Sequence, residues 1–273
     1  MLVAGYGAFA QTTTNYEVYA LRYATLATKT PISNWVLNGP DKDSIAPYFM
    51  FWLIRDNMGK NILVDAGCMP GLPSAVEFGL TNHIRPDSVL LQLKILPADI
   101  TDIIISHPHW DHIDGIQLFP NAQIWMQKDD YNYYAGGAWQ KDGNHGGFAK
   151  SDVVYLVGKN VEGKVTLVDG DNKEIFPGIT VYTGSRHTFN SQYVGVKTGN
   201  DRIIIASDNV WITYSLEKML PAPAYGTFDA AGYVAAMKRM KSLASKPEYI
   251  LTGHDPKPFS TFPSAAKDIV RIK

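Results

Sequence analysis

The apolar run Ile103-Ile104-Ile105 is followed directly by Ser106-His107-Pro108-His109-Trp110-Asp111-His112. An apolar run that ends in imidazoles and a carboxylate is typical of a buried strand with polar residues at its carboxyl end. His107 and His109 are two residues apart, so in extended chain both side chains point the same way and can share one metal ion. Asp111 and His112 follow where the chain turns, so they face a second point nearby. The stretch therefore predicts two adjacent metal positions.

The alternative is that these residues are unrelated polar groups in a loop. The chain has seven histidines and three of them lie in this one stretch, which makes chance clustering the weaker explanation. Imidazole and carboxylate donors without a thiolate suit Zn²⁺, although Co²⁺, Mn²⁺ or Fe²⁺ could occupy such a site.

The order HxHxDH resembles the signature of the metallo-β-lactamase superfamily. Four further motifs of that family also have counterparts in this chain, each at or after the end of an apolar strand. They contain Asp65, His187, Asp208 and His254, and the resemblance extends from about Tyr48 to Asp255. The resemblance implies an α/β fold, the four-layer αββα sandwich. It also implies one hydrolase domain over residues 16–273, preceded by an N-terminal arm over residues 1–15.

The resemblance also implies a ligand set for two Zn²⁺ ions per chain. The first ion would be held by His107, His109 and His187, the second by Asp111, His112 and His254, and Asp208 would bridge both. Such a pair of ions lowers the pKa of a bridging water and supplies hydroxide near neutral pH. Asp65 would accept a hydrogen bond from a ligand imidazole and fix its orientation, and the alternative for Asp65 is a simple turn residue.

Within the superfamily, the motif details look most like the N-acyl-homoserine lactonases, which are quorum-quenching enzymes. That likeness implies attack of the bridging hydroxide on a lactone carbonyl, with Asp111 passing a proton to the departing alkoxide. Trp110 would line the pocket for the acyl chain, and the alternative for Trp110 is ordinary core packing. The implied partner is a small-molecule lactone, and the oligomeric state, a homodimer included, stays open.

Three positions depart from the lactonase pattern. Trp211 stands where these enzymes have a Tyr that hydrogen-bonds the substrate, and an indole N–H can only donate. Tyr214, one helical turn further on, is the alternative substrate contact. Arg186 replaces the usual Gly, and Phe189-Asn190 replaces Pro-Gly. These departures concern loop shape and substrate contacts, and the metal ligands are all present.

Other functions were weighed against a lactonase. An arylesterase or phosphotriesterase would use the same metals and stays open. A β-lactamase of the main dizinc kind has Cys where this chain has Asp208, and a non-enzymatic zinc-binding module would favour closed Cys/His sites. Lys+Arg 25 against Asp+Glu 26 gives no basic surface that would indicate nucleic-acid binding.

Composition bounds the remaining properties. At 273 residues and 45% hydrophobic residues the chain can bury a full core, and no apolar run is long enough to predict a membrane span. The single Cys68 is expected to be a small buried hydrophobe. Ala8-Phe9-Ala10 fits the cleavage site of a truncated secretory signal. This favours a periplasmic or secreted enzyme from which residues 1–10 have been removed. The alternative is a cytoplasmic enzyme that keeps these residues as an N-terminal arm.

Alternation and turn residues predict the main elements. Residues 48–55 and 61–65 should form a hairpin, and the helices should include 88–95, capped by Asp87, and 228–243. Further strands are expected at residues 16–23, 102–106, 122–126, 164–168, 179–183, 192–197 and 202–207. The Gly-rich stretch 136–147 is either a flexible lid or a plain surface loop. His83 is expected at the surface.

Overall fold

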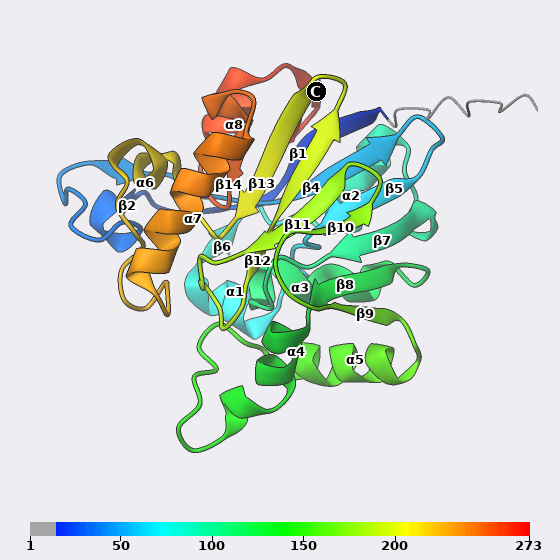
Figure 1. Cartoon of the computed structure of the whole chain (residues 1–273), viewed down its shortest axis with the longest axis horizontal. Helices are drawn as coiled ribbons and strands as arrows, with labels where there is room; N and C mark the ends of the chain where they lie inside the picture. The colour runs from blue at the N-terminus through cyan, green and yellow to red at the C-terminus, as the bar shows by residue number, and fades with distance from the viewer. Residues whose placement is uncertain (1–14) are drawn as a thin grey trace, which may run out of the picture.

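The computed structural model describes residues 15–273. Within that range the chain forms two large sheets (Figure 1). The first sheet has the order β15 (Ser264–Ala266), β16 (Ile269–Arg271), β1 (Tyr16–Leu26), β4 (Tyr48–Asp56), β5 (Asn61–Val64), β7 (Ile100–Ile104), β8 (Gln123–Gln127) and β9 (Val165–Val168), with β6 (Leu80–Thr81) paired to β1. The second has the order β10 (Lys173–Phe176), β11 (Ile179–Thr183), β12 (Gln192–Thr198), β13 (Asp201–Ser207) and β14 (Ile250–Thr252). The cleavage site predicted after Ala10 lies outside the described residues.

Side-chain alternation along the strands builds one core between the sheets and another core on each outer face. Successive residues of a strand point to opposite faces, so one strand serves two cores. In β4, Met50, Trp52 and Ile54 enter the core between the sheets, whereas Phe49, Phe51 and Leu53 enter the core on the outer face of the first sheet. In β13, Ile203 and Ile205 enter the shared core, and Ile204 enters the core on the outer face of the second sheet.

Helices cover both outer faces. The outer core of the first sheet takes residues from α2 (Pro86–Leu90), α4 (Lys128–Ala135) and α5 (Lys150–Val161). The outer core of the second sheet takes residues from α6 (Thr213–Lys218) and α7 (Ala230–Leu243). Figure 1 shows α4 and α5 in green on one side of the sheets and α7 in orange on the other. The predicted αββα sandwich is confirmed.

The topology brings the predicted ligands to one edge. β5, β7 and β8 run parallel, so their carboxyl ends lie together, with Val64 opposite Ile104. β13 and β14 are also parallel, with Ser207 opposite Thr252. Asp65, the His107 stretch, Asp208 and His254 each follow one of these strand ends, and carboxyl ends of parallel strands are where such sheets place their sites.

Several local predictions agree with the structure. The hairpin is antiparallel β4 and β5. The helix expected at 228–243 is α7, and Asp229 caps it, because its carboxylate accepts a hydrogen bond from the Gly232 N–H at 2.9 Å. Cys68 is fully buried. No helix within residues 15–273 is long and apolar enough to cross a membrane.

Three features differ from the sequence analysis. α2 begins at Pro86, so Asp87 lies inside its first turn and does not cap it; Pro suits the first helical position because its missing N–H is not needed there. His83 is half-buried rather than at the surface, with Nε2 3.0 Å from the Cys68 carbonyl oxygen. α5 was not predicted, because Val153 to Val157 is an unbroken apolar run rich in Val, and such a short run does not distinguish a helix from a buried strand.

Trp52 provides a test of the core between the sheets. It is fully buried, and its indole N–H has no hydrogen-bond partner among the described residues. We expect Trp52→Ala to lower the free energy of unfolding by about 3–5 kcal/mol through cavity formation. Trp52→Phe should cost far less, roughly 1–2 kcal/mol, because the lost volume is offset by removing an unsatisfied donor. Urea unfolding of the metal-free protein measures both, and equal losses would contradict this account of the core.

Candidate metal centre

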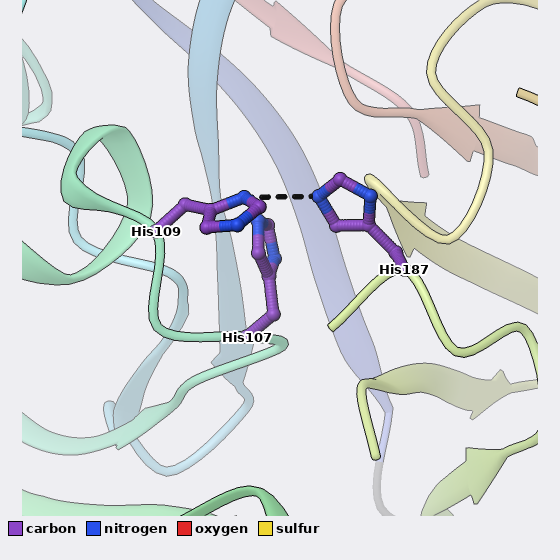
Figure 2. A group of neighbouring side chains, drawn as sticks. All are labelled: His107, His109 and His187. Atoms are coloured by element: carbon purple, nitrogen blue, oxygen red, sulfur yellow. Dashed lines mark hydrogen bonds between the residues drawn. The ribbon is translucent and has the colours of Figure 1, made fainter. Parts of the chain in front are cut away.

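The chain brings three imidazoles together at the first predicted metal position. His107 and His109 follow β7, and His187 comes from the connection between β11 and β12. Figure 2 shows the three rings pointing toward one another. One nitrogen of each ring lies within 4.8 Å of the others, and His109 Nδ1 is 3.0 Å from His187 Nε2. Three nitrogens at this spacing can hold one ion.

A second group lies beside the first. Asp111, His112 and His254 each offer a ligand atom within 4.8 Å of the others. Asp111 and His112 lie on α3 (Trp110–Ile113), a single helical turn after His109, and His254 follows β14. Asp111 Oδ2 is 3.2 Å from His112 Nε2 and 3.7 Å from His254 Nε2.

Asp208 lies between the two groups. Its Oδ2 is 3.6 Å from His187 Nε2 in the first group and 3.1 Å from His254 Nε2 in the second. Its Oδ1 is 3.5 Å from His112 Nε2. A carboxylate that lies close to ligands of both groups is in the position that a bridge between two ions requires.

Unsatisfied atoms at the centre test whether ions fit there. Nε2 of His107, Nε2 of His112 and Oδ1 of Asp208 are buried and have no hydrogen-bond partner among the described residues. Buried polar atoms normally have partners, and these three all point into the centre. Nitrogen and carboxylate donors without thiolate match Zn²⁺. The residues therefore fit two divalent ions.

Three of the ligand imidazoles, those of His112, His187 and His254, have Nδ1 against a protein oxygen. His187 Nδ1 is 2.8 Å from the Gly226 carbonyl oxygen, and His254 Nδ1 is 3.0 Å from the Tyr48 carbonyl oxygen. His112 Nδ1 is 2.9 Å from Asp65 Oδ2. Donation from Nδ1 to these oxygens fixes the tautomer and leaves Nε2 free for metal. The structure thus places Asp65 where an imidazole-orienting carboxylate is needed.

Burial and neighbouring charges shift the pKa values of the ligands. Burial, followed by the nearby His112 and His187, lowers the pKa of His107 well below its usual value. Burial lowers the pKa of His112, but Asp111 and Asp208 outweigh burial and raise it well above its usual value. Burial also raises the pKa of Asp208, and His254 and His112 outweigh it and hold that pKa well below its usual value. Metal binding at His112 therefore displaces a proton.

A cavity of about 510 Å³ opens directly onto the ligands, five of which line it: His109, Asp111, His187, Asp208 and His254. Trp110 also lines the cavity, with its ring stacked 6.3 Å from Phe49. Trp211 lines it from another side, 5.5 Å from the His187 ring. A site beside an apolar cavity of this size can take a small organic molecule.

Comparisons with known proteins agree with this geometry. A family model described as Metallo-beta-lactamase superfamily matches residues 50–254. The chain belongs to the metallo-β-lactamase superfamily.

Its curated relatives in this superfamily include lactonases. The N-acyl homoserine lactonase AttM of Rhizobium radiobacter is 26% identical, over 92% of this chain and 98% of the relative. The N-acyl homoserine lactonase AiiA of Bacillus thuringiensis subsp. kurstaki is 24% identical, over 64% of each chain. Thus the AiiA match spans just under two thirds of that relative's length.

Solved structures support the superfamily fold. A quorum-quenching N-acyl homoserine lactone lactonase superposes with a TM-score of 0.71 at 20% identity, over 93% of this chain and 98% of that chain. AidC, described as a dizinc quorum-quenching lactonase, superposes with a TM-score of 0.66 at 17% identity, over 91% of this chain and 93% of that chain. At these identities the likeness shows the fold alone.

Tyr214 does not join the other predicted residues. It lies on α6, partly buried against the outer core of the second sheet, and it is not among the described residues that line the cavity. The Lys218 ammonium lies 5.8 Å from its ring centre. Of the two alternatives for the substrate contact, only Trp211 reaches the cavity.

The Gly-rich stretch forms part of the cavity wall in this superfamily member. Asn144, Gly146 and Gly147 line the cavity, and the Tyr133 hydroxyl accepts a hydrogen bond from the Asn144 N–H at 2.7 Å. The Trp139 indole N–H donates to the Tyr134 carbonyl oxygen at 2.7 Å. The stretch 136–147 therefore borders the cavity rather than lying apart from it as a plain surface loop, and these hydrogen bonds brace it.

Other wall residues had no signal in the sequence motifs. Trp35, Phe148, Tyr225 and Phe228 line the cavity from connections between elements, and Phe78 lines it from the end of α1 (Pro73–Phe78). Connections carry no periodic pattern, so only the tertiary arrangement reveals these residues.

We expect two zinc ions per chain, both dependent on Asp208. The zinc-loaded protein should retain two ions after dialysis, and Asp208→Ala should retain fewer, because each group loses an oxygen placed toward it. Asp229→Asn, at the cap of α7, is the control and should retain two. Elemental analysis measures the content, and retention of two ions by Asp208→Ala would contradict the bridging position.

Gly147 should control the position of His109. Its φ is +78°, and a Cβ atom there would lie 2.5 Å from His109 Cδ2. We expect Gly147→Ala to push the ring and weaken binding at the first position by roughly 10- to 100-fold. Gly146→Ala, whose Cβ would meet only the Asn144 side chain at 3.2 Å, is the matched control. Metal titration and the Co²⁺ absorption spectrum measure the change. If Gly147→Ala bound metal as tightly as the wild-type protein, Gly147 would not control the position of His109.

Proposed function

We propose that this chain is a metal-dependent hydrolase that opens the ring of N-acyl-homoserine lactones. The observation that carries the proposal is the direct opening of an apolar cavity onto both ligand groups. The names of the curated relatives support a lactone as the substrate class. Two ions held by these residues would supply the Lewis acidity that activates water and polarises an ester carbonyl.

Asp111 is the residue that we propose moves the proton. It lines the cavity through α3, so an ester placed against the ligand groups can reach its carboxylate. Ring opening adds the elements of water across the C–O bond, so one proton must reach the departing ring oxygen. Burial raises the pKa of Asp111, but His112 and His254 bring it below its usual value. A carboxylate that holds a proton weakly can hand it on to an alkoxide, which is far more basic.

Two tryptophans orient the substrate in this proposal. The Trp211 ring lies beside His187, so its indole N–H can donate to the amide or ester oxygen of a bound lactone. Trp110 supplies apolar surface for the acyl chain, with Phe78 5.9 Å from its ring. Tyr214 has no part in this proposal, because it is not among the described residues that line the cavity.

A substrate panel tests the assignment. Lactones, aryl esters, phosphotriesters and β-lactams should be assayed on the zinc-loaded protein, and N-acyl-homoserine lactones should give the highest kcat/KM. Failure to open any of these lactones with both ions bound would reject the assignment. Turnover of aryl esters or phosphotriesters in that case would identify one of those groups as the substrate.

Asp111→Asn tests the proton transfer. An amide cannot carry the proton, so we expect kcat to fall by roughly 100-fold or more in protein that still holds two ions. Stopped-flow turnover with metal content measured on the same sample separates loss of proton transfer from loss of metal. Lactone opening at the wild-type rate by metal-replete Asp111→Asn would show that another group carries the proton.

A further inference from the structure

Two segments far apart in the sequence meet at the cavity. Thr30, Asn34 and Trp35 line it from the connection around β2 (Thr30–Pro31), and Trp211 and Tyr225 line it from the connections around α6. The rings of Trp35 and Trp211 lie 5.6 Å apart at 80°. Figure 1 shows the β2 segment beside α6. The Leu37 N–H donates to the Pro221 carbonyl oxygen at 2.9 Å, which ties the two segments outside the cavity.

Tyr225 ties the same segments at the cavity itself. Its hydroxyl donates to the Asn34 carbonyl oxygen at 2.6 Å. The Tyr225 residue is 73% exposed, so burial does not hold it. Its ring lies 5.9 Å from the Trp211 ring, tilted by 35°. The described contacts that hold the Tyr225 side chain at the solvent end of the cavity are thus this hydrogen bond and this ring contact.

A row of rings leads from the metal ligands to Tyr225. The first step, from His187 to Trp211, is 5.5 Å, and the second, from Trp211 to Tyr225, is 5.9 Å. A substituent that starts at the ligand groups and follows the face of Trp211 therefore meets Tyr225 after two ring spacings. Beyond that point it must displace the ring or break the bond to Asn34.

We propose that the Tyr225–Asn34 bridge closes this end of the cavity and limits the length of the acyl chain that a substrate can carry. The inference rests on the proposed function, because it names which members of that substrate class fit. Acyl chains that end before the bridge are buried among the aromatic rings. Longer chains must open the bridge, so Tyr225 determines specificity and takes no part in the chemistry.

A chain-length series on metal-loaded protein tests the inference. With N-acyl-homoserine lactones from butanoyl to dodecanoyl, wild-type kcat/KM should rise by up to roughly fourfold per methylene and then fall once the chain reaches the bridge. Tyr225→Ala removes the ring, so the maximum of kcat/KM should move to longer acyl chains. The ratio of kcat/KM for the dodecanoyl lactone to kcat/KM for the hexanoyl lactone should rise about tenfold. Tyr225→Phe keeps the ring and loses the bond, so it should move the maximum in the same direction by less.

Tyr214→Ala is the matched control, because Tyr214 is a neighbouring tyrosine on α6 that does not line the cavity. It should keep the wild-type maximum. An unmoved maximum in Tyr225→Ala would overturn the inference, and wild-type behaviour of Tyr225→Phe would overturn the part played by the hydrogen bond. Circular dichroism and zinc content establish that each variant is folded and loaded.

A binding series separates failure of this inference from failure of the proposed function. Ring-opened N-acyl-homoserines of the same lengths can be titrated against the fluorescence of Trp35, Trp110 and Trp211, which line the cavity. An affinity maximum that moves in Tyr225→Ala would support the length limit even if no lactone were opened. Absence of a maximum, or absence of binding at every length, would overturn it.

Discussion

The buried carboxylate of Asp65 is the interaction on which the centre depends. It is fully buried and accepts hydrogen bonds from the Ser106 N–H at 2.7 Å, the Ser106 hydroxyl at 2.9 Å and the Ser207 hydroxyl at 2.7 Å. It also faces His112 Nδ1. A buried carboxylate is costly unless it is paired in this way. Because Ser106 follows β7 and Ser207 ends β13, one side chain joins the ligand-bearing ends of both sheets and orients an imidazole between them.

The buried strands could be predicted from their composition. β4 and β13 appear in the sequence as unbroken apolar runs, because both faces of each strand are buried and alternate residues enter two different apolar cores. Six of the seven predicted ligands follow the ends of parallel strands, which leave little freedom in where those ends lie, and His187 comes from the connection between the antiparallel strands β11 and β12. α5 was missed because its apolar run Val153 to Val157 could equally belong to a buried strand, and α2 begins at Pro86, one residue before the Asp87 that was expected to cap it.

Several residues of the cavity wall, unlike most of the metal ligands, do not follow the ends of strands. Trp35, Tyr225 and the stretch 136–147 lie on connections whose course depends on bonds between distant residues, such as Tyr225 to Asn34. No local pattern encodes those bonds, so these parts of the wall and their bracing could not be predicted, whereas Trp110 and Trp211, next to metal-ligand motifs, could be. Connections also tolerate substitution more readily than strands, which suits them to setting substrate preference. Trp211 shows the consequence, since it offers a donor where the lactonase pattern offers a hydroxyl that donates and accepts.

The wall and the ligands are nevertheless coupled through backbone that has no room for side chains. The Gly226 carbonyl holds His187, and a Cβ atom on Gly226 would overlap the Trp211 ring. Gly147 packs against His109, and its carbonyl accepts a hydrogen bond from the Trp110 N–H at 2.9 Å. A backbone shift in either loop would therefore move a metal ligand as well as the wall. Tyr225 is next to Gly226, and its largely exposed side chain reaches the Trp211 ring and the Asn34 carbonyl oxygen. Its side chain can change the cavity while the backbone that orients His187 stays in place.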